Sequence, residues 1–124
     1  MAEMYFTKEH EWIKVEGAIG KVGISDHAAH ELGDITFVEL PKPGKSVKQF
    51  EVLAAIESVK AASDIYSPVS GKVLTVNRVM DTAPEIVNES AEEKGWMVEL
   101  EILDVAELEK LMTVGQYDEY LKTL

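Results

Sequence analysis

The chain has 124 residues, enough for one domain with a hydrophobic core, and it contains no cysteine. The lack of cysteine excludes a disulfide framework, a thiolate metal site and a cysteine nucleophile. Its 23 acidic and 12 basic residues give a formal net charge of −11, which disfavours nucleic acid and anionic membranes as partners. We therefore expect a single domain spanning residues 1–124.

Short β-rich runs broken by glycine and proline fill the first two-thirds of the chain. The predicted strands are residues 12–15, 19–24, 35–40, 52–57, 72–77 and 97–102. The first and last of them alternate apolar and polar residues, as half-buried antiparallel strands do. No helical pattern of 10 to 15 residues separates one strand from the next, which disfavours parallel βαβ units. The predicted fold is mainly β, a flattened barrel or sandwich of short antiparallel strands.

Short helices are expected around these strands. Ser25 is a capping residue for a helix over 26–32, and Gly33 is its stop signal. Pro84 is expected at the first position of a single helical turn over 84–87.

Two more helices are predicted near the C-terminus. The first follows a cap at Asp104 and reaches Met112, and the second opens with Thr113-Val114-Gly115-Gln116 and runs to Leu124. We expect both to pack across the sheet. Their outward-facing acids are expected to be solvated: Glu107, Glu109, Asp118 and Glu119.

Several apparent motifs fail when their spacing is examined. Gly44-Lys45-Ser46 matches the end of a phosphate-binding loop, but Glu39 stands where that loop needs its first glycine. His27 and His30 are three residues apart, yet no third metal ligand can be named beside them, so we expect no metal site. The serines lack the context of a hydrolase nucleophile. The sequence thus predicts no active site of its own.

Lys60 lies at the bend between two β-rich runs, Val52 to Ile56 and Ile65 to Val76. On its position alone, a lysine in a hairpin loop is most often a solvated charge. The alternative is an attachment point for a prosthetic group, because the turn presents a primary amine.

The residues around this lysine favour the second interpretation. The string ESVKAASDIYSPVSG, residues 57 to 71, closely resembles the lipoylation hairpin of the glycine cleavage system H protein family. Further segments resemble the same family in the same order, from about Phe6 to Tyr120: residues 7–12, 22–26, 32–41 and 95–96. The resemblance therefore covers nearly the whole chain.

The resemblance implies a lipoyl-type fold in which lipoic acid is joined by an amide to Lys60. The neighbours that would form the hairpin context are Glu57, Ser58, Val59 and Ala61. Attachment would need a lipoate ligase or a lipoyl/octanoyl transferase that reaches an exposed amine, and acylation would remove its charge.

The family's role implies a non-catalytic, monomeric carrier. It shuttles the aminomethyl group of glycine from the pyridoxal-phosphate-dependent glycine decarboxylase (P protein) to the tetrahydrofolate-dependent aminomethyltransferase (T protein). Dihydrolipoamide dehydrogenase (L protein) then reoxidises the arm. By the same resemblance, Glu11 and Asp64 are candidate charge partners for the aminomethyl amine in an arm groove.

Other interpretations remain beside this one. A lipoyl relay that donates lipoyl groups to 2-oxoacid dehydrogenase complexes is the main alternative. A biotin carrier would have methionines beside the lysine, where this chain has Val59 and Ala61. Within the resemblance, residues 90–94 lack aromatic and glycine residues that many relatives carry, and Glu31 replaces a histidine found in some. These departures leave open any arm contact that the resemblance would assign to the helix over 26–32.

The first residues, 1–7, lack a basic region followed by an apolar one, and no stretch approaches the ~18 apolar residues of a membrane span. We expect a soluble cytoplasmic protein, or one of the mitochondrial matrix if a transit peptide was removed.

Overall fold

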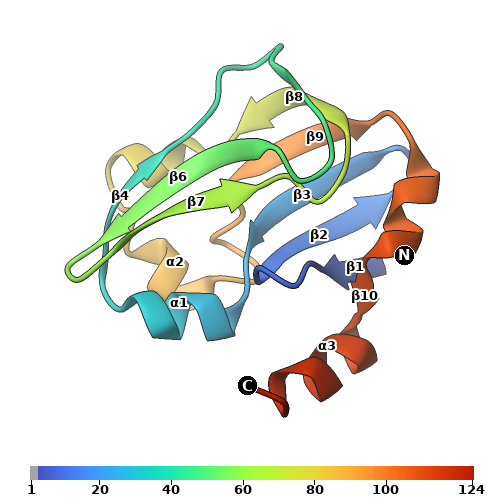
Figure 1. The fold of residues 1–124 in the computed structure, drawn as a ribbon. Helices are drawn as coiled ribbons and strands as arrows, with labels where there is room; N and C mark the ends of the chain where they lie inside the picture. The colour runs from blue at the N-terminus through green and yellow to red at the C-terminus, as the bar shows by residue number, and fades with distance from the viewer. Residues whose placement is uncertain (1–2) are drawn as a thin grey trace.

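The computed structural model describes residues 3–124, which form two antiparallel sheets that face each other (Figure 1). The larger sheet contains, in spatial order, β10 (Met112–Thr113), β1 (Glu3–Phe6), β2 (Glu11–Glu16), β3 (Ile19–Ile24), β9 (Val98–Ile102), β8 (Gly71–Val76) and β5 (Ser46–Val47). The smaller sheet contains β4 (Ile35–Glu39), β6 (Val52–Ser58) and β7 (Ala62–Tyr66). The mainly β prediction is confirmed, and of its two forms the sandwich is the correct one, because the two sheets do not close into a barrel.

All six predicted strands are present, and each end coincides with the predicted one or differs from it by one residue. Four other strands of the described residues lie outside the predicted set: β1, β5, β7 and β10. β5 and β10 are two residues long, too short for an alternating pattern to be visible in the sequence. They are strands because they pair, β5 with β8 and β10 with β1.

The main core lies between the sheets. Alternate residues of β9 are buried as predicted, with Val98, Leu100 and Ile102 inside and Glu101 exposed. The strand β2 departs from simple alternation, because Trp12 faces away from this core and is nevertheless fully buried. It belongs to a second apolar cluster with Phe6 and Tyr117, so both faces of the sheet are covered at this point.

The helix α1 (Asp26–Leu32) has the predicted limits. The Ser25 hydroxyl accepts a hydrogen bond from the Ala28 amide over 3.1 Å, and Gly33 ends the helix with φ of 82°. α2 (Ile86–Ser90) begins two residues after Pro84, so the expected first position is wrong by half a turn. The 3₁₀ turn η1 (Arg78–Asp81) was not predicted.

The C-terminal region corrects part of the prediction. The segment after Asp104 is a 3₁₀ helix, η2 (Val105–Lys110), and Met112 lies in β10 rather than on a helical face. The second helix, α3 (Val114–Leu121), is confirmed, with Thr113 and Gln116 forming a reciprocal capping box.

The packing of these segments also differs from expectation. α3 lies below the sandwich in Figure 1 and contacts β1 and β10, the strands at one edge of the larger sheet, where its Tyr117 packs on Phe6 and Trp12. Tyr117 is its buried residue, whereas Val114 and Leu124 are exposed. Glu107 is not a free surface acid, because its carboxylate accepts hydrogen bonds from the amide and hydroxyl of Ser70 over 2.7 and 2.8 Å.

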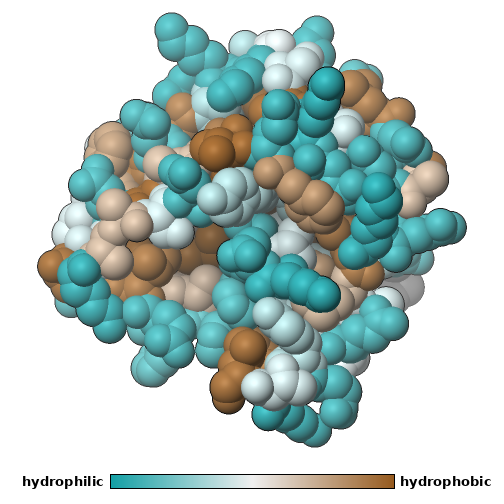
Figure 2. All heavy atoms as spheres, viewed as in Figure 1, coloured by the Kyte–Doolittle hydropathy of each residue, from teal (hydrophilic) through white to brown (hydrophobic). Residues whose placement is uncertain are grey.

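Hydrophilic side chains cover most of the face seen in Figure 2, with separate apolar patches between them. Within residues 3–124, no helix combines the length and the apolar character that crossing a membrane requires.

Candidate functional site

Lys60 lies at the end of the hairpin formed by β6 and β7, which extends beyond the body of the sandwich at the left of Figure 1. The lysine is exposed, and its Nζ forms no hydrogen bond or ion pair with any of residues 3–124. The amine is therefore accessible to an acylating enzyme, while antiparallel pairing fixes the two strands that present it.

The turn itself is braced by Ser58. Its hydroxyl accepts hydrogen bonds from the amides of Lys60 and Ala61, over 3.3 and 3.1 Å. The Ser58 amide in turn donates to the Ala61 carbonyl over 2.8 Å. Among the expected hairpin residues, Ser58 thus orders the backbone around the lysine, and Val59 is left 69% exposed beside it.

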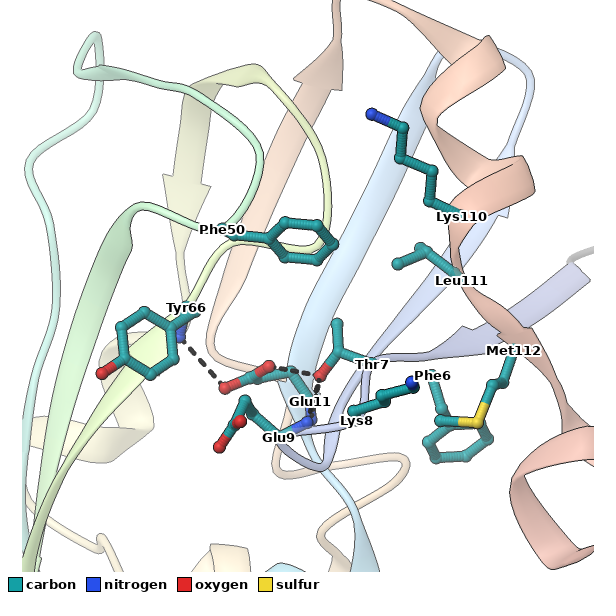
Figure 3. A pocket seen from close by; sticks show the side chains of 10 residues that line it. All are labelled: Phe6, Thr7, Lys8, Glu9, Glu11, Phe50, Tyr66, Lys110, Leu111 and Met112. Carbon is teal, nitrogen blue, oxygen red and sulfur yellow. Dashed lines mark hydrogen bonds between the residues drawn. The ribbon is translucent and has the colours of Figure 1, made fainter. Parts of the chain in front are cut away.

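A pocket of about 450 Å³ lies at the other end of β7 (Figure 3). It is lined by Phe6, Thr7, Lys8, Glu9, Glu11, Phe50, Tyr66, Lys110, Leu111 and Met112. Residues from β1, β2, the end of β7 and the segment leading into β10 therefore meet here, although they are far apart in the sequence.

Glu11 is the buried acid of this pocket, only 2% exposed. Its Oε2 accepts a hydrogen bond from the Tyr66 amide over 3.1 Å, and its Oε1 accepts one from the Thr7 hydroxyl (Figure 3). Burial raises the pKa of Glu11 above the ordinary carboxyl value, and this effect exceeds the lowering by the two hydrogen bonds. The pocket therefore contains a carboxylate that a cation would stabilise.

Asp64, the second predicted groove residue, lies elsewhere. It is exposed on the face of β7 opposite the buried Ile65, and it lines a pocket on the smaller sheet with Phe37 and Glu57. The structure does not bring Glu11 and Asp64 into one pocket.

Phe50 lines the pocket of Glu11 and was not singled out by the sequence. Its φ is 67°, a left-handed conformation that a bulky side chain rarely adopts, and its ring is 50% exposed above the pocket (Figure 3). The Glu51 amide donates to the Lys48 carbonyl over 3.0 Å, which closes a turn around Phe50. Glycine would have marked a left-handed position in the sequence, whereas phenylalanine gives no sign of one.

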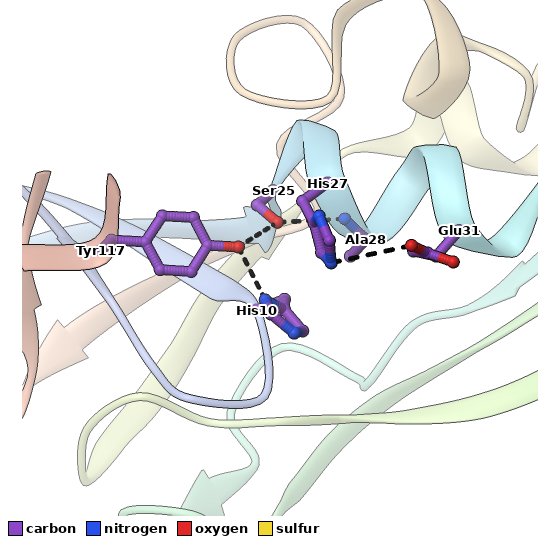
Figure 4. A network of polar contacts seen from close by, with 6 residues as sticks. All are labelled: His10, Ser25, His27, Ala28, Glu31 and Tyr117. Carbon is purple, nitrogen blue, oxygen red and sulfur yellow. Dashed lines mark hydrogen bonds and ion pairs between the residues drawn. The ribbon is translucent and has the colours of Figure 1, made fainter. Parts of the chain in front are cut away.

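A polar network at the start of α1 joins the N- and C-terminal parts of the chain (Figure 4). The Tyr117 hydroxyl lies 2.7 Å from His10 Nδ1 and 2.8 Å from the Ser25 hydroxyl. The rings of His10 and His27 lie 4.6 Å apart between centroids. Burial lowers the pKa of His10, and the nearby His27 lowers it further.

His27 pairs with Glu31 at 3.9 Å and is used in this network rather than as half of a metal pair with His30. Across residues 3–124, no three histidine, aspartate or glutamate side chains gather as a metal site would require. These residues connect α1 to α3.

Comparison with known proteins gives one consistent result. The family model described as glycine cleavage H-protein matches residues 4–124. Glycine cleavage system H proteins of Bacillus licheniformis and Paramagnetospirillum magneticum are 48% and 50% identical, over 97% and 100% of this chain and 94% and 99% of theirs. The crystal structure of a glycine cleavage system H protein from Mycobacterium marinum superposes with a TM-score of 0.86 at 30% identity, covering 97% of each chain.

Proposed function

The chain belongs to the glycine cleavage H-protein family, and on this premise we propose that Lys60 carries its lipoyl group. The family predicted from residues 57–71 is thereby confirmed, and with it the role of carrier in the glycine cleavage system. The observation that supports Lys60 is its position, an exposed and unpaired amine on a braced turn.

The residues around Lys60 fit an amide-linked lipoyl group. An acylating enzyme needs a free amine, and the exposed Nζ meets that need. When bound, the lipoyl dithiolane supplies the disulfide that takes up and releases the one-carbon unit. Because the chain has no cysteine, no thiol of its own competes for that disulfide.

The chain itself contributes position and charge, and we assign it no catalytic step. Antiparallel pairing of β6 with β7 holds the backbone of the lysine at a fixed point while its side chain is exposed. The pocket of Glu11 offers a buried carboxylate beside apolar walls from Phe6, Leu111 and Met112. We propose that the Glu11 carboxylate pairs with the ammonium of the carried aminomethyl group. A buried carboxylate attracts a cation more strongly than an exposed one.

We propose that Asp64 also pairs with the carried ammonium, but at an exposed position outside the pocket of Glu11. Its exposed carboxylate lies on the lysine-bearing strand, four residues beyond Lys60. Because Asp64 and Glu11 line different pockets, we propose that they act at successive positions of the arm rather than together on one ammonium.

The partners proposed for the chain are the other enzymes of the system, namely glycine decarboxylase, aminomethyltransferase and dihydrolipoamide dehydrogenase, together with the enzyme that attaches the lipoyl group. The names of the relatives refer to the glycine cleavage system. The lipoyl-relay alternative is therefore not favoured, and we retain the carrier role.

The attachment site is tested by mass spectrometry. The protein is co-expressed with a lipoate ligase in the presence of lipoate, and intact mass and peptide mapping locate the adduct. We expect one lipoyl group on Lys60 and none in Lys60→Arg. Lys45→Arg is the matched control, because Lys45 is also an exposed lysine next to a turn, and it should retain the adduct. An adduct that persists in Lys60→Arg would contradict the proposal.

The roles of Glu11 and Asp64 are tested separately on lipoylated protein. Glu11→Gln, Asp64→Asn and the double variant are loaded with glycine and glycine decarboxylase, and the spontaneous loss of the aminomethyl group is followed by mass. We expect faster loss from the single variants and the fastest from the double variant. Loading and loss rates equal to those of the parent would refute both assignments.

A further inference from the structure

The loop that carries Lys60 spans residues 58–61, between the paired residues Glu57 and Ala62. Val59 and Lys60 both have negative φ, as expected for a four-residue hairpin loop built around a type I turn. Within the loop, Ser58 makes hydrogen bonds to Lys60 and Ala61. The Val59 amide finds its partner outside the loop, so the loop also receives support from another segment.

Part of that support comes from the segment that joins α1 to β4, residues 33–35. The Val59 amide donates a hydrogen bond to the Asp34 carbonyl over 3.0 Å. The side chain of Lys60 lies directly on Gly33, since a Cβ built at this glycine would be 3.2 Å from the lysine Cε. The 33–35 segment is therefore the surface on which the turn rests.

Asn88, on α2, holds this segment from its other side. Its Nδ2 donates to the Gly33 carbonyl over 2.8 Å, and its Oδ1 accepts from the Ile35 amide over 2.9 Å. One side-chain amide thus binds the backbone on both sides of Asp34, whose carbonyl receives the Val59 amide. Asn88 is separated from Gly33 by 55 positions in the sequence and from Ile35 by 53.

We propose that Asn88 is a positioning residue for lipoylation, which fixes the 33–35 segment and through it the orientation of the Lys60 turn. The proposal rests on Lys60 as the attachment site. Asn88 touches neither Lys60 nor the acyl group, so it acts only through the backbone of residues 33–35. An acylating enzyme that recognises the hairpin as a rigid shape loses catalytic efficiency when the turn samples several orientations.

The test compares Asn88→Ala with Asn77→Ala. Asn77 is a matched control, because its side chain also bridges backbone groups, accepting from the Val79 amide and donating to the Lys94 and Trp96 carbonyls. Three quantities are measured: hydrogen exchange of the Val59 amide, kcat/KM for lipoylation by lipoate ligase with lipoate and ATP, and the rate at which a small acetylating reagent modifies Lys60.

In Asn88→Ala we expect exchange at Val59 to be at least about fivefold faster and ligase kcat/KM to fall by at least the same factor. Fivefold is the size that one lost hydrogen bond implies, and this variant loses two. Acetylation by the small reagent should be unchanged, because the amine stays exposed and the reagent does not read the shape of the turn. In Asn77→Ala all three quantities should stay at parental values.

Equal Val59 exchange and equal ligase kcat/KM in the two variants would overturn the role of Asn88. So would a parallel loss of acetylation and lipoylation, since that would indicate a buried or altered amine instead of a reoriented turn. A parent protein that the ligase does not modify at all would contradict the proposed function instead. Val59 exchange would still decide whether Asn88 holds the turn.

Discussion

The Tyr66 amide donates a hydrogen bond to the buried Glu11 carboxylate over 3.1 Å, and this bond links the two sheets of the sandwich. Glu11 begins β2 of the larger sheet, and Tyr66 ends β7 of the smaller one. The other end of β7 leads into the turn of Lys60. The pocket of Glu11 and the proposed lipoyl lysine thus lie at the two ends of a single strand.

Glu11→Gln should change the pH dependence of stability. Because burial raises the pKa of Glu11, the folded protein binds this proton more tightly than the unfolded chain does. The contribution of Glu11 to the stability of the parent therefore falls as the pH rises from the ordinary carboxyl value through the raised one. Glutamine keeps an oxygen that accepts from Tyr66 but carries no charge. The difference in Tm, variant minus parent, should grow from acid to neutral pH in thermal unfolding.

A constant Tm difference across that pH range would contradict the expectation for Glu11. Glu3→Gln is a suitable comparison, because Glu3 is exposed and lies outside the pocket. The growth of the Tm difference with pH should be larger for Glu11→Gln than for Glu3→Gln.

Phe50→Gly and Phe50→Ala separate backbone strain from the loss of the ring. Both variants remove the aromatic wall of the pocket, but only glycine adopts φ near 67° without strain. We expect Phe50→Gly to be about 1 kcal/mol more stable than Phe50→Ala in chemical denaturation. Equal stabilities would show that the left-handed backbone at this position carries no strain.

Local signals explain why much of the fold could be predicted from the sequence. Ser25 and Gly33 delimit α1 because a cap and a left-handed stop depend on neighbouring residues alone. The alternation in β9 likewise follows from the period of a strand. The lysine hairpin was found because its residues are contiguous, so one continuous string contains its whole pattern.

Features that depend on distant contacts could not be predicted in this way. Asn88 contacts residues more than 50 positions away, and nothing in its own neighbourhood indicates which backbone groups it binds. Glu107 looks like a surface acid on a helix until Ser70 is placed beside it by the fold. Glu11 was named by family resemblance, but its burial and its bond to Tyr66 appear only in the structure.

Tyr117→Phe should destabilise the junction between α1 and α3. The variant keeps the stacking on Phe6, whose ring centroid lies 4.0 Å away, but loses the hydroxyl that contacts His10 and the fully buried Ser25. We expect a loss of about 1–2 kcal/mol in the free energy of unfolding, because buried polar groups are left with fewer partners.

Tyr120→Phe is the matched control for this junction. The Tyr120 hydroxyl donates to the Lys8 carbonyl over 3.3 Å at an exposed position, so its loss should cost less than about 0.5 kcal/mol. Equal losses in the free energy of unfolding of Tyr117→Phe and Tyr120→Phe, measured in urea, would contradict a larger stabilising contribution from the buried network.

Gly23→Ala and Gly115→Ala should move stability in opposite directions. A Cβ at Gly23 would lie 2.7 Å from Trp12 Cζ2, and the indole is held in place by hydrogen bonds to the Ile24 and Ala91 carbonyls. We therefore expect Gly23→Ala to lose about 1–3 kcal/mol of unfolding free energy from overpacking.

A Cβ at Gly115, in the first turn of α3, meets nothing within 4 Å. Alanine there should add roughly 0.5 kcal/mol to the free energy of unfolding through its higher helix propensity. Urea denaturation of both variants checks the pair, and a Gly23→Ala variant as stable as the parent would show that Trp12 can shift within its cluster.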